Sequence, residues 1–193
     1  MKKIIFVAIV LWSSCVNSAS AKGDFERFGD VFRLLPVFVA VVSLGMKDYR
    51  GFAELAVGSL VTQGIIEGVK RSFDAAHKKG YNVAFAKRPC CDDYKGMPSG
   101  HAGGAFSAAG FVFYRYGYKP ALPVITLALL TDASRVYAGK HSIWQVATGS
   151  LIGWGVAWIV TSKYVPKNLS ITPDIDSDIR GHTSYGINVA YRF

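Results

Sequence analysis

Two histidines and two arginines stand in three short polar runs in the middle of the chain. These runs are Lys87-Arg88-Pro89, Pro98-Ser99-Gly100-His101, and Ser134-Arg135 with His141 beyond it. Each arginine offers a planar fork of donors that suits the oxygens of a phosphate. Two histidines beside one phosphate can divide the work between a nucleophile and a general acid. The pattern therefore predicts phosphoryl transfer through a covalent histidine intermediate.

The second and third runs adjoin apolar segments that favour the same chemistry. Pro98 to His101 opens an apolar segment, so we expect Ser99 to cap a helix whose first N–H groups and positive dipole end face an anion. Arg135 follows a long apolar stretch, where an unpaired charge is costly, and this favours a functional role. Asp132 lies one turn earlier and is a candidate partner for Arg135.

The three runs resemble the motifs of the type-2 phosphatidic acid phosphatase family, which is related to the vanadium haloperoxidases. The resemblance covers roughly residues 51–163, and Gly149 and Gly153 continue its small-residue pattern. It implies that His141 attacks phosphorus and that His101 protonates the leaving oxygen and then activates water. It also implies that Arg88, Arg135, a lysine and the amides of Ser99 and Gly100 bind the phosphate. No metal or other cofactor is expected.

The family's motif lysine is missing from its usual place. It should stand seven residues before Arg88, where this chain has Tyr81. Lys70, at the end of an apolar run, is the expected counterpart, with about eleven residues inserted. Lys79 and Lys87 are weaker candidates.

The family's last aspartate is replaced by Gln145. An amide oxygen can still accept a hydrogen bond from His141, but it supplies no negative charge to raise the basicity of the imidazole. We therefore expect an active but slower nucleophile. Bacterial lipid A phosphatases tolerate variation at the positions of the motif lysine and the last aspartate, so the resemblance favours that branch of the family.

The apolar segments predict an all-α, polytopic membrane bundle of five helices, or six if the N-terminal segment is retained. The five expected segments are Val31–Met46, Phe52–Val69, Ser99–Tyr116, Ala121–Tyr137 and Ser142–Tyr164. Asp24–Asp30 is read as a polar surface entry, and Arg71–Pro98 as a long loop, with a short helix near Phe73–Lys78 as an alternative. The loop contains the neighbours Cys90 and Cys91, expected as free or externally paired thiols. Residues 22–167 then form the phosphatase domain. Residues 168–193 form a polar tail, which ends in a short strand or a disordered segment.

The N-terminus and the charge balance indicate where the protein acts. Residues 1–21 have the basic, apolar and small-residue regions of a signal peptide, with an uncleaved first helix as the alternative. Without Lys2 and Lys3 the chain keeps 20 basic and 13 acidic residues, a net charge of +7. In so apolar a chain this excess favours anionic lipid over nucleic acid. We expect a multi-pass protein of the bacterial inner membrane, with its active site facing the periplasm and no obligate protein partner.

The expected activity is removal of a phosphate from a lipid head group, with lipid A favoured. Undecaprenyl pyrophosphate, phosphatidylglycerophosphate and phosphatidic acid are alternative substrates, because all present phosphate at a membrane surface. A lipid phosphotransferase would need the same residues, and a non-catalytic binder of anionic lipid is a further alternative. A soluble haloperoxidase is disfavoured by the short, apolar chain.

Overall fold

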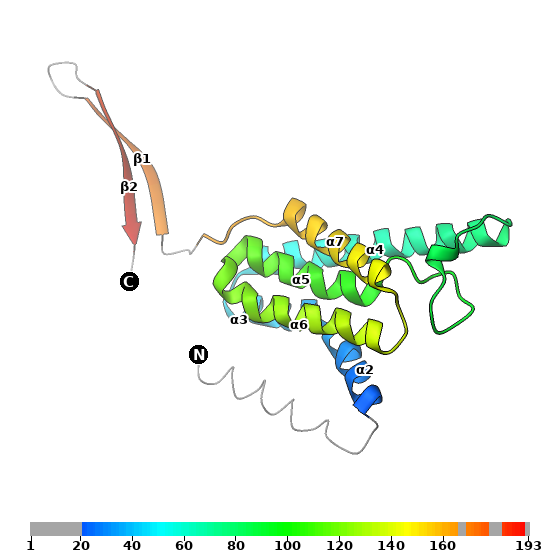
Figure 1. Ribbon diagram of the computed structural model, residues 1–193. Coiled ribbons are helices and arrows are strands. Elements are labelled where there is room, and N and C mark those ends of the chain that lie inside the picture. Colours follow the sequence, from blue (N-terminus) through cyan, green and yellow to red (C-terminus); the bar gives the residue numbers. More distant parts are fainter. Residues whose placement is uncertain (1–20, 166–168, 178–182, 192–193) are drawn as a thin grey trace.

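The computed structural model describes residues 21–165, 169–177 and 183–191. The all-α bundle predicted from the sequence is confirmed (Figure 1). Its helices are α2 (Ala21–Phe32), α3 (Leu35–Gly45), α4 (Tyr49–Lys78), α5 (Gly100–Tyr116), α6 (Tyr118–Tyr137) and α7 (Ile143–Val160), with the 3-10 turn η1 (Ala84–Ala86) before α5. The expected signal peptide, residues 1–21, lies outside the described residues apart from Ala21.

The described residues hold one helix more than the five expected. The segment read as one helix from Val31 breaks at Arg33 and Leu34, and α2 and α3 meet there at 44°. Pro36 stands in the first turn of α3, where a missing N–H costs nothing and the fixed φ favours a helix start. Asp24–Asp30, read as a polar surface entry, is helical and lies within α2, with Asp24, Arg27 and Asp30 exposed.

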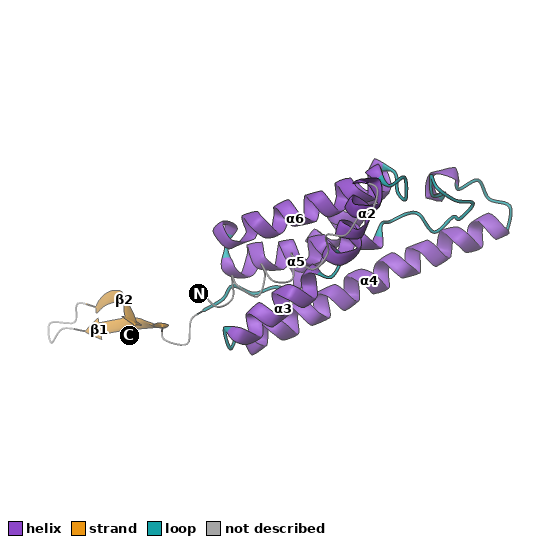
Figure 2. Cartoon of the chain, turned by 90° about the horizontal axis from the view of Figure 1, so that it is seen from below, coloured by secondary structure: helices purple, strands orange, loops and turns teal. Residues whose placement is uncertain are grey.

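Helix α5 is the centre of the bundle and packs against α4, α6 and α7 (Figure 2). The helices approach closely because small residues face one another. A side chain at Gly149 on α7 would collide with the backbone carbonyl of Ser99, and one at Gly153 with that of Gly103. The small-residue pattern after the last motif thus brings α7 against the start of α5, which places His141 near His101.

Two described helices, α4 and α7, are long and apolar enough to cross a membrane, and a third span exists if the bent α2–α3 pair counts as one. Large apolar side chains on these helices point outward, among them Leu60, Leu151 and Ile159. Exposed apolar surface of this extent is typical of contact with lipid.

A buried ion network closes the end of the bundle opposite the motif residues. Arg115 on α5 pairs with Asp48, with Glu54 on α4 at 3.0 Å, and with the Ser162 carbonyl at 2.9 Å. Burial opposes ionisation of Asp48, but hydrogen bonds from Arg115 and Tyr116 outweigh it and lower the pKa of Asp48 to about 2. Loss of one partner would leave a buried charge uncompensated, so this network fixes how α4, α5 and α7 meet.

The tail contains a two-stranded antiparallel sheet rather than a single strand. Strand β1 (Leu169–Ser177) pairs with β2 (Thr183–Tyr191). The strand expected from Tyr185 onward is confirmed as part of β2. The sequence concealed β1 because Pro173 and its aspartate neighbours are poor strand formers.

Candidate active site

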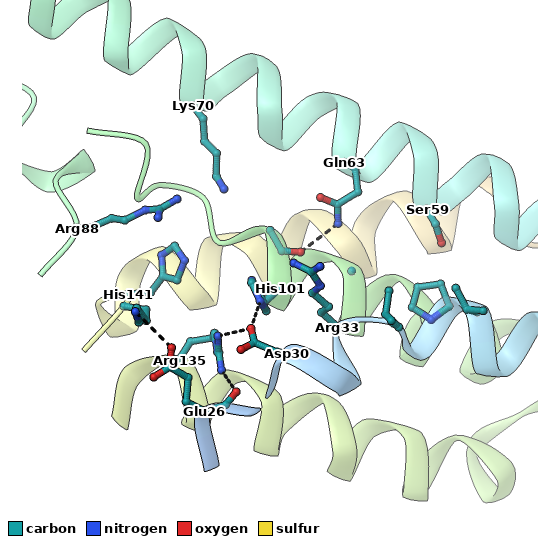
Figure 3. A pocket seen from close by; sticks show the side chains of 16 residues that line it. Glu26, Asp30, Arg33, Ser59, Gln63, Lys70, Arg88, His101, Arg135 and His141 are labelled. Atoms are coloured by element: carbon teal, nitrogen blue, oxygen red, sulfur yellow. Dashed lines mark hydrogen bonds and ion pairs between the residues drawn. The ribbon is translucent and has the colours of Figure 1, made fainter. Parts of the chain in front are cut away.

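A cavity of about 600 Å³ opens at the end of the bundle where α5 and α7 begin and α6 ends. Six of the eight residues predicted for the site line it: Lys70, Arg88, Gly100, His101, Arg135 and His141 (Figure 3). The other two, Ser99 and Gln145, are buried behind this lining. The motif spacing therefore brings all three runs to one place, as the helical connections require.

His141 stands in the connection between α6 and α7 with one ring nitrogen fixed. Its Nδ1 lies 2.9 Å from the Gly96 carbonyl oxygen and 3.2 Å from Gln145 Oε1. Both partners accept hydrogen bonds, so Nδ1 carries the proton and Nε2 keeps its lone pair. Burial is the largest influence on this group and lowers the pKa of His141 to about 4. The imidazole is therefore neutral and nucleophilic at Nε2 over most of the pH range.

Gln145 does more than contact His141. It is buried in the first turn of α7, where it forms a capping box with Ser142. Its Nε2 donates to the backbone carbonyls of Phe85, at 3.0 Å, and Lys87, at 2.8 Å. The amide thus ties the chain segment that leads to Arg88 to the helix that follows His141. The sequence predicted the contact with His141, but not this anchor nor the Gly96 carbonyl.

His101 faces His141 across the cavity and is held by a residue that the sequence did not single out. Its Nε2 lies 2.9 Å from Asp30 Oδ1, on α2. The same oxygen accepts a hydrogen bond from Arg135 Nη1, also at 2.9 Å. No described residue hydrogen-bonds Nδ1 of His101, so that nitrogen remains for a substrate. The only signal for Asp30 was its charge, which is equally typical of a solvated stretch.

Arg135 is buried, and the partner expected for it is wrong. Besides Asp30, its guanidinium donates to the backbone carbonyl of Glu26 and to Ser134 Oγ. Asp132 instead accepts a hydrogen bond of 2.6 Å from Ser150 on α7. The two side chains leave α6 toward different neighbours, Asp132 toward α7 and Arg135 toward α2.

Lys70 points into the cavity from α4, as expected for the displaced lysine. It forms no hydrogen bond or ion pair with any described residue, and its Nζ lies 3.6 Å from the position that a Cβ on Gly100 would occupy. Lys79 is exposed at the end of α4, and Lys87 pairs with Asp92 at 2.9 Å. Helix α4 continues for two turns past Lys70, so much of the expected loop from Arg71 onward is helical, and the extra residues extend beyond the site.

Gly100 provides the free amide that we expected at the start of α5, but Ser99 does not. The Ser99 N–H donates to the Gln145 carbonyl oxygen at 2.8 Å, and its hydroxyl makes no capping bond. That hydroxyl is buried without a partner among the described residues. The Gly100 N–H precedes the first intrahelical bond of α5 and can donate to an anion.

The loop that carries Arg88 also contains the two adjacent cysteines. Cys90 and Cys91 are joined in a disulfide, so the expectation of free or externally paired thiols is wrong. Arg88 Nε lies 3.3 Å from Asp93 Oδ2 across this loop. The described residues contain no group of three or more His, Cys, Asp and Glu side chains placed to share a metal ion.

Comparison with known proteins accounts for this arrangement. The model of the PAP2 superfamily matches residues 54–169, which is more than half of the chain. The chain belongs to the PAP2 superfamily. The resemblance seen in the motifs is thereby confirmed. The superfamily match includes all eight predicted site residues, whereas Glu26, Asp30 and Arg33 precede it.

Two proteins that are named lipid A phosphatases are similar to this chain in sequence. A lipid A 4'-phosphatase of Helicobacter pylori strain J99 is 57% identical over 198 residues, with both chains covered completely. A lipid A 1-phosphatase of Helicobacter pylori strain 26695 is 28% identical over 135 residues, which cover 69% of this chain and 70% of the relative. No solved structure matches the chain significantly.

Proposed function

We propose that this protein is a lipid A phosphatase of the bacterial inner membrane that works through a phosphohistidine intermediate. The observation that carries the proposal is the lone pair of His141 Nε2, which faces a cavity lined by cations with a second histidine across it. The identity of 57% to a lipid A 4'-phosphatase over the whole chain favours the 4'-phosphate as the group removed.

The reaction proceeds in two halves. In the first, His141 Nε2 forms a bond to phosphorus while the bond to the lipid oxygen breaks, and protonated His101 gives its proton to that oxygen. In the second, His101 takes a proton from water, whose oxygen attacks phosphorus and releases His141 and inorganic phosphate. The charges of Lys70, Arg88 and Arg135, with the Gly100 amide, stabilise the phosphoryl oxygens as the bonds change.

Both ends of the bundle are basic, and a phosphate site explains the excess at the cavity end, so the opposite end is the one to compare with the cytoplasmic side. The connections at the opposite end of the bundle carry Lys47, Arg50, Lys119 and Lys163. Basic residues accumulate in cytoplasmic connections of membrane proteins. Lipid substrates then reach the cavity at the periplasmic surface, and no protein partner is needed for the chemistry.

The test compares the wild-type protein with His141→Ala in mixed micelles. Lipid A, phosphatidic acid and undecaprenyl pyrophosphate are supplied separately, phosphate release is measured, and the lipid products are identified by mass spectrometry. We expect the wild type to act best on lipid A and His141→Ala to lose at least about a thousandfold, as for other removed nucleophiles. Full activity of His141→Ala in a folded protein would end the phosphohistidine mechanism.

A further inference from the structure

Arg33 brings a third arginine to the cavity, from the break between α2 and α3. The helix ends at Phe32 and the next begins at Leu35, so Arg33 lies at the bend. Its side chain lies in the cavity beside His101 and Gln63 (Figure 3). The residue precedes the stretch matched by the superfamily model.

Among the residues that the structure describes, the guanidinium of Arg33 has no partner. No described residue forms a hydrogen bond or an ion pair with it, whereas Arg135 in the same cavity uses the acceptors Asp30 and Glu26. Arg33 is exposed and lines the cavity, so its free guanidinium donors are open to a ligand that enters.

The cations of the cavity divide between the two histidines. Lys70 and Arg88 lie near His141, while Arg135, held by Asp30, and Arg33, which has no partner among the described residues, lie near His101 (Figure 3). In the proposed reaction the nucleophile is on the His141 side and the leaving group is on the His101 side. Arg33 is therefore placed to meet the alcohol part of the substrate rather than the phosphate that is transferred.

The surroundings of Arg33 are suited to a hydroxylated or amide-bearing group. Gln63 Nε2 donates to the Gly100 carbonyl at 3.0 Å, which leaves Gln63 Oε1 free to accept. On α5, a Cβ at Gly104 would lie only 3.1 Å from Gln63 Nε2 and 3.1 Å from the Arg33 carbonyl oxygen, so this glycine lets α5 approach both residues closely. The arrangement provides a charged donor and a neutral acceptor on the His101 side of the cavity.

We infer that Arg33, with Gln63, forms a subsite that binds the sugar carrying the scissile phosphate, and so selects saccharide phosphates over glycerol phosphates. The inference rests on the proposed function. An N-acylated glucosamine offers amide carbonyl and hydroxyl oxygens to the guanidinium and hydroxyl donors to Gln63 Oε1. Phosphatidic acid offers only ester oxygens at this distance from phosphorus. Arg33 is thus a specificity-determining residue, while the phosphate itself is bound by Lys70, Arg88 and Arg135.

The experiment measures kcat/KM for lipid A and for phosphatidic acid in the same micelles, in wild type and in Arg33→Ala. A hydrogen bond to a charged group contributes about 1.5–3 kcal/mol, so the loss on lipid A should be roughly ten- to a hundredfold. The loss on phosphatidic acid should be at least about five times smaller. Arg33→Lys keeps the charge but not the planar pair of donors. Its ratio of kcat/KM for lipid A to kcat/KM for phosphatidic acid should lie between those of the wild type and Arg33→Ala. Arg27→Ala, which removes an exposed arginine on α2 outside the cavity lining, is the matched control.

Binding measurements separate this inference from the proposed function. In the inactive His141→Ala background, Arg33→Ala should weaken lipid A binding by about tenfold and phosphatidic acid binding by less. Equal loss for the two lipids, or no loss for either, would overturn the sugar subsite. Absence of phosphate release by the wild type would overturn the proposed function alone, because the binding comparison does not need catalysis.

Discussion

Asp30 and His101 lie 71 residues apart in the sequence and 2.9 Å apart in the site. The Asp30 oxygen that meets His101 Nε2 also accepts from Arg135, so one carboxylate fixes a histidine and an arginine together. The contact makes α2 part of the active site rather than a polar entry to the bundle. Gly29 permits it, because a side chain there would collide with Ser134 and Arg135.

The first prediction concerns this carboxylate. Asp30→Asn keeps the size of the side chain but removes the charge that orients His101 and stabilises its protonated form. We expect kcat to fall by roughly ten- to a hundredfold, and the basic limb of the pH–rate profile, where His101 loses its proton, to move to lower pH. Phosphate release measured across pH provides both values.

Asp24→Asn is the matched control for Asp30→Asn, since Asp24 is exposed in the first turn of the same helix and, among the described residues, pairs with Arg27 alone. A purely structural role for Asp30 would lower the amount of folded protein without moving the pH profile. A profile of unchanged shape would therefore count against a role through His101.

The second prediction concerns the acidic limb of the same profile. The pKa of His141 is lowered by burial to about 4, below its usual value of 6.5. The nucleophile is therefore still neutral at pH 5 and is lost only as the pH falls through about 4. We expect kcat/KM to keep an acidic limb near pH 4–5 rather than near 6.5. The profile is measured with two lipid phosphates of different pKa, because a limb caused by the enzyme stays at the same pH with both substrates. An acidic limb that stays near pH 6.5 with both would contradict the burial argument.

The third prediction concerns Lys70. Because its Nζ has no described acid partner and faces the cavity, Lys70→Ala should lower phosphate release by roughly ten- to a hundredfold. Lys79→Ala and Lys87→Ala remove an exposed charge and a charge paired with Asp92, and should change the rate less than about threefold. Were the Lys79 variant the slowest of the three, the assignment of Lys70 as the displaced motif lysine would be wrong.

What the sequence revealed and concealed follows from the kind of contact involved. The residues on the motif runs were predictable because their spacing, with apolar helices between, brings helix ends together. Lys70 was found because it ends an apolar run, although its motif spacing is lost. Asp30 was missed because nothing in a short acidic stretch indicates a partner so far along the chain. The Gly96 carbonyl was missed because a backbone contact depends on no side-chain type.

The helix count illustrates the same limit. The break at Arg33 and Leu34 lies within an apolar run. Pro36, just beyond it, is compatible both with a bend inside one long helix and with the first turn of a second helix, so the sequence does not distinguish the two. The position of Arg33 in the cavity follows only from the direction of that break. A residue whose role depends on a bend angle therefore carries no sequence signal of its own.

The last prediction concerns Gln145, the position where the chain departs from its family. Gln145→Ala removes the acceptor for His141 and the two donor contacts to Phe85 and Lys87 together. We expect kcat to fall by roughly ten- to a thousandfold, about 1.4–4 kcal/mol of barrier. Thr148→Ala, one turn further along α7, is the control, because its hydroxyl bonds only to the Trp144 carbonyl.

Gln145→Asp restores the residue of the family but should not restore a faster nucleophile. The aspartate side chain is one methylene shorter and its carboxylate has no N–H, so it cannot donate to the carbonyls of Phe85 and Lys87 that Nε2 now meets. Each carbonyl left unpaired in this buried place costs about 1–3 kcal/mol, and the buried charge adds to that cost. We therefore expect a lower melting temperature in detergent and a kcat no higher than that of the wild type. A variant that melts like the wild type and works faster would show that Gln145 orients His141 without anchoring the loop before Arg88.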